Sequence, residues 1–144
     1  MTKTASEANT VDVNTNATLR ILADELDPDV VSAEMGMAPD RSHRKGDVRG
    51  VRTPVVSKGG YWSITSSRHI DAAADTNEHI QWLVDAVARK LDMLAIYKSR
   101  GWTVDVWIGI HTSVGHGGPT LRADVLAQLA ALGLDVNLDL YPDA

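Results

Sequence analysis

A basic segment within an acidic chain is the first candidate for binding chemistry. Six basic residues and one acid lie between Arg41 and Lys58, a net charge of +5, whereas the whole chain of 144 residues carries −5. Folding does not require such segregation, and the segment creates a field that a charged partner would feel. Guanidinium and ammonium groups bind carboxylates and phosphates through charge-assisted hydrogen bonds. The pattern predicts a site for a small anion or an acidic partner, formed by Arg41, Arg44, Lys45, Arg49 and Arg52.

An acidic segment next to it offers a second interpretation. Residues 24–34 contain five acids and no base, namely Asp24, Glu25, Asp27, Asp29 and Glu34. Because the two segments adjoin in the chain, they can neutralise each other across the fold. Both interpretations remain open at the level of the sequence.

A second candidate surface comes from two strand patterns. Apolar residues alternate with other types from Trp102 to Thr112 and again from Leu134 to Tyr141. Trp107 and Tyr141 fall on the polar phase, where an aromatic residue is either half-covered by a loop or exposed as an anchor for a partner. The predicted protein-binding surface comprises Trp107, Tyr141, His111, Asp105 and Asp139.

Residues for catalysis do not converge in the sequence. The chain has no cysteine, no HExxH motif and no nucleophile motif of the Gly-x-Ser-x-Gly kind. Asp105 and His111 are about 20 Å apart along one strand at roughly 3.3 Å per residue, too far for an acid–base pair. Asp105 and Asp139 are placed to be neighbours across strands, as solvated carboxylates. His111 and His116 flank the Gly-rich loop 113–119, which lacks the lysine of a phosphate loop. We therefore expect no cofactor, no metal site and no enzymatic activity.

Helical and extended patterns define the elements that position these residues. Asp27 and Pro28 begin a helix that Gly36 ends, and Asp75 begins a long amphipathic helix that runs to about Arg100. A third helix is predicted from Ala123 to Leu132. Strands are expected at 18–22, 51–56, 61–66, 102–112 and 134–141, with Gly59-Gly60 as a hairpin turn between the second and third.

The predicted fold class is α+β. The C-terminal part of the chain has the order strand, helix, strand, which predicts two parallel strands. The hairpin predicts an antiparallel pair, so we expect a mixed sheet. Clean alternation in the last two strands indicates a sheet covered on one face only. We expect a two-layer sandwich of about five strands with two to three helices on one face. Residues 1–16 are expected to form a disordered leader, and 17–144 a single domain.

Composition indicates the cellular compartment of the protein and the classes of partner it can bind. The absence of cysteine suits a reducing cytosol, and neither a signal peptide nor a membrane span is visible. The acidic balance argues against general nucleic-acid affinity. We expect a bacterial protein of the cytoplasm that does not contact membranes.

The order of several motifs resembles a known family. Leu19–Asp29, Arg41 to Asp47, Tyr61-Trp62-Ser63, Glu78-His79-Ile80, Gly101–Ile110 and Leu121–Tyr141 together resemble the bacterial domain-of-unknown-function family 4279. The resemblance implies a small α+β domain and carries no established activity. It also implies that Arg41, Gly46, Asp47 and Trp62 form one structural unit, which leaves Arg44, Lys45, Arg49 and Arg52 available for a partner.

These observations favour a non-enzymatic protein-binding module, with an immunity or accessory factor as the kind of protein. The alternative is a small-molecule or anion-binding protein that uses the basic loop 41–52.

Overall fold

Strands with alternating side chains build one five-stranded sheet in the computed structural model, which describes residues 13–113 and 117–142. The strand order is β2-β5-β1-β6-β7. The strands are β1 (Val13–Ala23), β2 (Arg41–His43), β5 (Gly60–Thr65), β6 (Thr103–Thr112) and β7 (Asp135–Pro142). Three of the pairings are antiparallel, and β7 runs parallel to β6. The predicted mixed sheet is confirmed.

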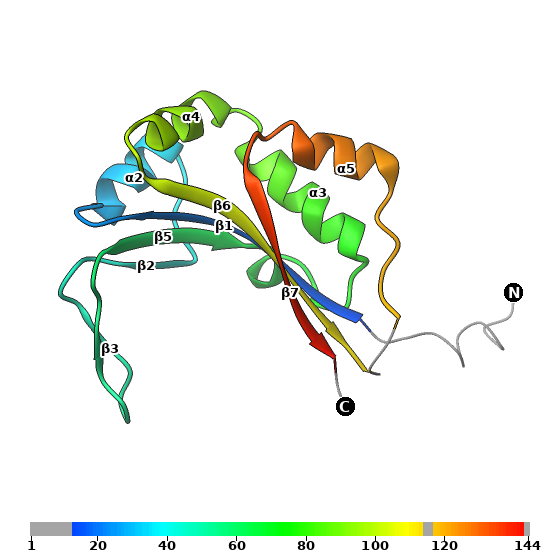
Figure 1. Ribbon diagram of the computed structural model, residues 1–144, viewed down its shortest axis with the longest axis horizontal. Helices are drawn as coiled ribbons and strands as arrows, with labels where there is room; N and C mark the ends of the chain where they lie inside the picture. The colour runs from blue at the N-terminus through cyan, green and yellow to red at the C-terminus, as the bar shows by residue number, and fades with distance from the viewer. Residues whose placement is uncertain (1–12, 114–116, 143–144) are drawn as a thin grey trace, which may run out of the picture.

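All helices cover one face of this sheet (Figure 1). They are α2 (Pro28–Met35), α3 (Thr76–Val87), α4 (Leu91–Ser99) and α5 (Ala123–Ala130), with a short 3-10 turn, η1, at Ser66–Arg68. Asp27 caps α2 by accepting from the Asp29 amide at 2.9 Å, and Gly36 ends it at φ 69°. The layers therefore match the predicted two-layer α+β sandwich, with one helix more than expected.

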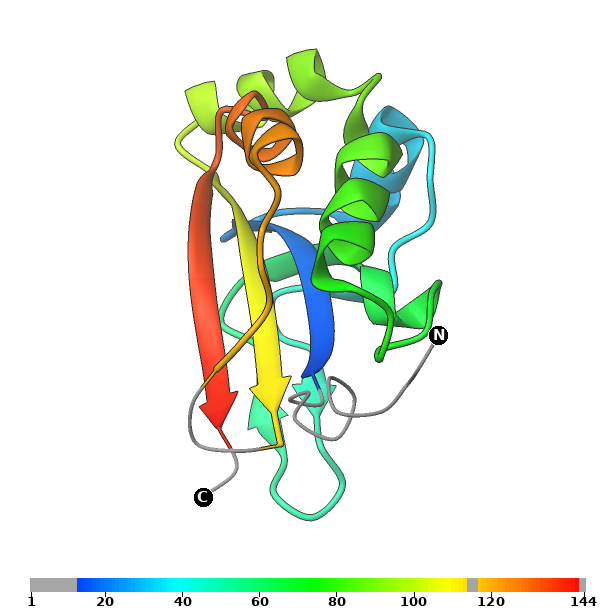
Figure 2. The same cartoon turned by 90° about the vertical axis from the view of Figure 1, so that its right-hand side faces the viewer.

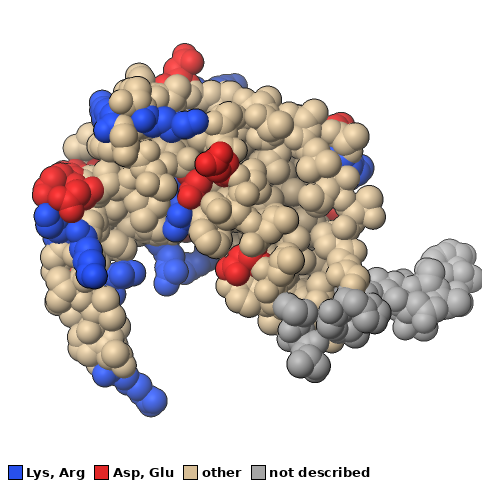
Figure 3. All heavy atoms as spheres, viewed as in Figure 1, with Lys and Arg blue, Asp and Glu red and all other residues tan. Residues whose placement is uncertain are grey.

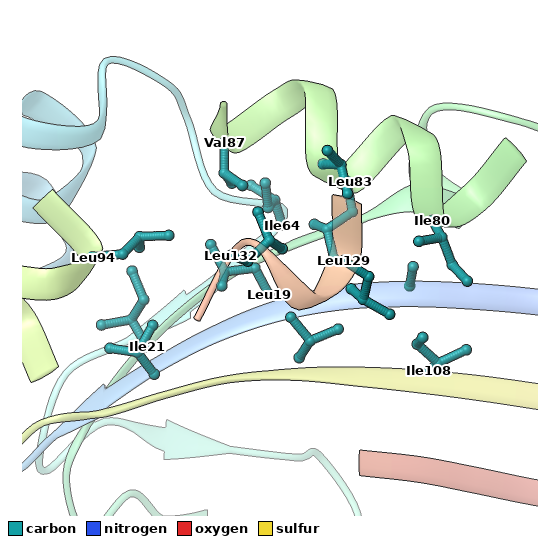
Figure 4. Packing of buried hydrophobic residues seen from close by; sticks show 14 of the residues in the cluster. Leu19, Ile21, Ile64, Ile80, Leu83, Val87, Leu94, Ile108, Leu129 and Leu132 are labelled. Atoms are coloured by element: carbon teal, nitrogen blue, oxygen red, sulfur yellow. The ribbon is translucent and has the colours of Figure 1, made fainter. Parts of the chain in front are cut away.

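The core lies between the helices and the sheet (Figure 4). Leu19 and Ile21 of β1, Ile64 of β5 and Ile108 of β6 point toward Leu83 and the other apolar residues of the helices, and each of these five is at most 2% exposed. Fully buried aliphatic side chains of this kind contribute about 1.5–3 kcal/mol each. None of the described helices lies on the opposite face of the sheet.

The long helix predicted from Asp75 to Arg100 is wrong as one element. It divides into α3 and α4, with Ala88, Arg89 and Lys90 between them. The ammonium of Lys90 donates to the backbone carbonyl of Glu34 at 3.0 Å. Because the helix divides here, α4 packs against a different part of the molecule from α3. Its buried residues are Leu94 and Tyr97.

The predicted hairpin turn at Gly59-Gly60 is also wrong. Gly60 begins β5, and its amide donates to the carbonyl of Asp24. A Cβ on Gly60 would lie 2.3 Å from the carbonyl oxygen of Leu26. Glycine is therefore required here, because the backbones of residues 60 and 26 approach closely. The hairpin instead joins β3 (Val48–Arg49) to β4 (Val55–Val56), in place of the single strand expected at 51–56.

This two-stranded ribbon, residues 48–56, is called the arm. It projects away from the main sheet on the side without helices (Figures 1 and 2). Its valines are exposed, namely Val48, Val51, Val55 and Val56.

The first strand begins earlier than expected. β1 starts at Val13 rather than Thr18, so residues 13–16 belong to the sheet and not to a leader. Residues 1–12 of the predicted leader lie outside the described residues.

Candidate functional site

The uncovered side of the sheet, called the open face, presents the polar phase of each strand. In β6 the side chains of Thr103, Asp105, Trp107 and His111 alternate with buried valines and isoleucines, as the sequence predicts. Strand pairing sets them in rows across the sheet. Trp107 lies beside Thr18 of β1 and Asn137 of β7, while Gly109 lies beside Asn16 and Asp139.

A bidentate ion pair joins two strands of the open face. Arg20 donates from Nε to Oδ1 of Asp105 at 2.8 Å and from a terminal nitrogen to Oδ2 at 2.9 Å. Asp105 is only 8% exposed, and its hydrogen bond to Arg20 raises the pKa of the guanidinium further. The prediction of solvated, neighbouring carboxylates at Asp105 and Asp139 is wrong, because Asp105 pairs with Asp135 in the register and Asp139 pairs with Gly109.

Trp107 stands at the centre of this face. The guanidinium carbon of Arg20 lies 4.8 Å from the centre of its ring, so the same arginine that binds Asp105 also covers Trp107. The side chain is half-buried, and its Nε1 is buried without a hydrogen-bond partner among the described residues. A buried indole N–H usually has an acceptor, and this one has none among the described residues.

A hollow of about 420 Å³ lies beside Trp107. Gly109 forms part of its floor, since a residue with a side chain there would occupy this space. Four of the five predicted partner-binding residues line it, and Asp105 does not. The lining residues include Trp107, His111, Asp139, Tyr141, Gly109, Arg20, Tyr61, Asn14, Asn16 and Thr18.

The rim of the hollow is aromatic and acidic. The rings of His111 and Tyr141 stack with centroids 6.1 Å apart. The Tyr141 hydroxyl donates to Asp139, and this hydrogen bond raises the pKa of Tyr141. The hollow therefore combines aromatic rings with one carboxylate.

Sequence reasoning missed Arg20, Tyr61 and the polar residues of β1. The missed signal was the alternation of Asn14, Asn16, Thr18 and Arg20 with Thr15, Ala17, Leu19 and Ile21. This alternation runs over the whole strand, but the N-terminal part of β1 was assigned to the leader.

The acidic segment neutralises two of the six basic residues of the basic segment, in line with the second interpretation of the sequence. Arg44 donates to Asp27 at 2.7 Å and to Asp29 at 2.8 Å, and the ammonium of Lys45 lies 3.0 Å from Asp24 and 3.3 Å from Glu25. The expectation that Arg44 and Lys45 remain available for a partner is therefore wrong. Exposed pairs of this kind add little stability. Their consequence here is that two cations of the basic segment bind the protein's own acids at the surface.

The turn implied by the family resemblance is present. Asp47 accepts from the backbone amide of Arg44 at 2.7 Å, and Gly46 has φ 91°. Trp62, by contrast, belongs to the core: it is 0% exposed and donates to Ser32 on α2 at 3.0 Å. The turn and Trp62 thus lie in different surroundings rather than in one unit.

Two cations of the basic segment face a second hollow. Arg41 and Arg49 line a space of about 460 Å³ together with Asp40, Ser42, His43 and Tyr61. Neither arginine has an ion-pair partner within 13–113 and 117–142. Burial lowers the pKa of His43, and the charges of Arg49 and Arg41 lower it further. Arg52 lies in the exposed turn of the arm, and Figure 3 shows basic side chains on this side of the molecule.

A serine and a histidine lie in contact elsewhere, inside the core. The Ser66 hydroxyl is 2.6 Å from Nδ1 of His79, and Nε2 of His79 is 2.9 Å from the carbonyl of Asp71. The carbonyl must accept from Nε2–H, so Nδ1 accepts from Ser66. Both side chains are 0% exposed, which places the pair out of reach of a substrate. It connects η1 to α3 and supports β1, because the Ala17 amide donates to Ser66.

Acid should destabilise the protein through His79. Burial lowers the pKa of His79 below its ordinary value, so the unfolded chain binds a proton that the folded chain does not. The contribution of His79 to the free energy of unfolding should be constant well above pH 6.5 and fall as the pH drops below about 6.5, the value for an unfolded histidine. His43 acts in the same direction. Urea unfolding measures the free energy of unfolding at pH 8 and at pH 5. Between these two values of pH, His79→Gln should lose less of it than the parent does, although the variant is less stable than the parent at pH 8 by about 1–3 kcal/mol. Equal losses would contradict the assignment.

Two further classes of feature are absent from the described residues. Within 13–113 and 117–142, no group of three or more His, Asp or Glu side chains is placed to hold a metal ion. No helix in the same ranges has the length and apolar character required to cross a bilayer. His116, named in the sequence as a flank of the Gly-rich loop, lies outside the described residues.

Comparisons with known proteins place the chain in a family. Neither the curated proteins nor the solved structures include a match. One family model matches residues 13–143, the part of the chain that holds the whole described sheet and all four helices. The chain belongs to the family described as Domain of unknown function (DUF4279).

Proposed function

We propose that this protein is a non-enzymatic binding module whose open face receives a partner protein. The observation that carries the proposal is the hollow beside Trp107, whose wall is formed by aromatic side chains. Tryptophan, tyrosine and arginine are the residue types that dominate interface energies, and Trp107, Tyr141, Tyr61 and Arg20 all line this hollow.

The chemistry of the face supports binding rather than catalysis. Asp105 is held by Arg20, and the Ser66–His79 pair is sealed in the core. The arm adds exposed valines on the same side of the sheet, which enlarges the apolar surface offered to a partner. The composition without cysteine supports a location in the cytoplasm of a bacterium. Within this proposal, the protein is an immunity or accessory factor.

Variants on the open face should weaken the complex selectively. A partner recovered with the tagged protein is purified and titrated by calorimetry against Trp107→Ala and Gly109→Leu. A Cβ at Gly109 meets nothing closer than 3.8 Å, so the second variant fills the hollow without disturbing the strand. Each should weaken affinity roughly 30-fold or more, the effect of a hot-spot residue worth about 2 kcal/mol.

The matched control is Ile96→Ala on α4. Ile96 is an exposed apolar residue on the helical side, 44% accessible, and its loss should leave affinity unchanged. Full affinity of both Trp107→Ala and Gly109→Leu, with thermal stability intact, would refute the proposal.

A second candidate function is anion binding at Arg41 and Arg49. The observation that favours it is that both line one hollow without an ion-pair partner in the described residues. Inorganic phosphate and organic acids should raise the melting temperature of the parent and not of Arg41→Gln or Arg49→Gln, with Arg52→Gln as control. No stabilisation of the parent by any of these anions would remove this candidate.

A further inference from the structure

The edge strand β7 differs from the strand at the other edge of the sheet. β7 has eight residues and, among the described strands, pairs only with β6, whereas β2 at the opposite edge has three residues. A short edge strand resists pairing with another chain, and a long one presents a row of backbone donors and acceptors to it. β7 carries no lysine, and its proline stands only at its last position.

The helix layer ends before β7. Val136, Leu138 and Leu140 are 37%, 58% and 61% exposed, although their neighbours in β6, Val106, Ile108 and Ile110, are at most 8% exposed. Figure 2 shows β7 at the margin of the sheet, away from α3. The margin therefore combines a backbone edge that no described strand pairs with and an apolar stripe on the helical side.

The sequence of β7 is compatible with pairing to a copy of itself. In an antiparallel pair around a twofold axis, only registers centred on a residue keep both helix layers on the same side of the joined sheet. Centring on Leu138 places Val136 opposite the partner's Leu140 and Asn137 opposite the partner's Asp139. Asp135 then faces the partner's Tyr141, so every acid meets a residue without negative charge.

Neighbouring registers are unfavourable. Centring on Asn137 sets Asp135 against the partner's Asp139, and centring on Asp139 sets two Asp139 carboxylates against each other. Like charges directly opposite destabilise a strand pair. Centring on Val136 or on Leu140 shortens the overlap at one end of β7. The register on Leu138 aligns residues 135–141 of both strands and pairs the apolar residues Val136, Leu138 and Leu140 only with one another.

We propose that the protein is a homodimer in which two β7 strands pair antiparallel about Leu138 and form one ten-stranded sheet. The two open faces then become one continuous surface. The partner's Asn137 lies opposite Asp139, which lines the hollow beside Trp107. The proposed dimer depends only on the exposed edge of the sheet at β7 and not on what the open face binds.

The oligomeric state tests the proposal directly. Sedimentation equilibrium of the parent should report a dimer that dissociates on dilution. Leu138→Lys should be monomeric over the same range, because two ammonium groups would meet at the twofold axis. Leu126→Lys, a matched change at an exposed leucine of α5, 44% accessible, should remain dimeric. A monomeric parent, or a dimer unaffected by Leu138→Lys, would overturn the proposal.

Single cysteines test the register, since the chain has none of its own. Directly opposed residues place their Cβ atoms about 4.5–5.5 Å apart, close to the span of a disulfide at about 3.5–4.5 Å. Under mild oxidation Leu138→Cys should form a covalent dimer. Val136→Cys and Leu140→Cys should each remain uncrosslinked alone and crosslink when mixed. Crosslinking of Leu126→Cys in place of these pairs would place the interface elsewhere and overturn the inference.

Discussion

Trp62→Ala should lower the free energy of unfolding by about 3–5 kcal/mol, the cost of removing a large aromatic side chain from a close-packed core. Trp62 is 0% exposed and is the largest fully buried side chain among the described residues. It lies on β5 and donates from Nε1 to Ser32 of α2 at 3.0 Å, so it joins the sheet to a helix. Since the stability of a domain is about 5–15 kcal/mol in total, the variant should lose a large fraction of its stability.

The conservative change separates packing from hydrogen bonding. Trp62→Phe keeps most of the ring in the core and removes the donor to Ser32, so its loss should be clearly smaller than that of Trp62→Ala. Ser32→Ala leaves the indole N–H without its acceptor and should cost about 1–3 kcal/mol. Urea unfolding followed by far-UV circular dichroism is the measurement, because the substitution removes one of four tryptophans that fluorescence would report. A loss under about 1 kcal/mol for Trp62→Ala would contradict the packing described.

Asp105→Ala should lower the free energy of unfolding by about 3 kcal/mol, the low end for breaking a buried ion pair by removing one partner. The side chains of Arg20 and Asp105 are 26% and 12% exposed, so Arg20 loses a carboxylate that water replaces only in part. The guanidinium that covers Trp107 also loses its anchor. The same variant should therefore weaken binding at the open face.

A double-mutant cycle isolates the pair. Arg20→Met and Asp105→Ala should each destabilise the protein, and the combined variant should be more stable than the sum of the two losses predicts, with a coupling energy of about 1–3 kcal/mol. Replacing both partners by apolar groups removes the uncompensated charge, which is why the losses should not add. Strictly additive losses would mean that the ion pair contributes nothing to the fold.

Local patterns were reliable where one physical signal dominated. The cap at Asp27, the stop at Gly36 and the alternation in β6 were all readable, because capping chemistry and a two-residue period act within a few residues. The break between α3 and α4 was not readable, since Ala88, Arg89 and Lys90 are all compatible with a helix. That break accompanies contacts with α2, 56 residues away in sequence, such as the bond from Lys90 to Glu34.

Glycine was interpreted wrongly for a related reason. A Gly-Gly pair between two extended patterns normally indicates a hairpin. At Gly60 the glycine serves a close approach to the backbone of Leu26, a neighbour that becomes visible only when β5 lies against the start of α2. The actual hairpin formed one segment earlier, in the arm.

The candidate site was also predictable from the sequence only in part. Residue types and periodicity placed Trp107, His111, Asp139 and Tyr141 on one face of the sheet, and the hollow brings these four together. Charge counting identified the basic segment and the acidic segment that neutralises part of it, but not which side chains pair, because an ion pair depends on where two side chains meet in space. Folding directed Arg44 and Lys45 to the acids at 24–29 and set Arg20 between Asp105 and Trp107.

The chain's own patterns were thus sufficient for the class of fold, the two layers and the polar side of the sheet, all of which follow from short-range periodicity. Strand order, the break in the long helix, the pairing of charges and the exposed margin at β7 were established by folding alone. Each of these depends on residues distant in sequence that meet across a sheet or at its edge, and no local pattern records which strand is left without a neighbour.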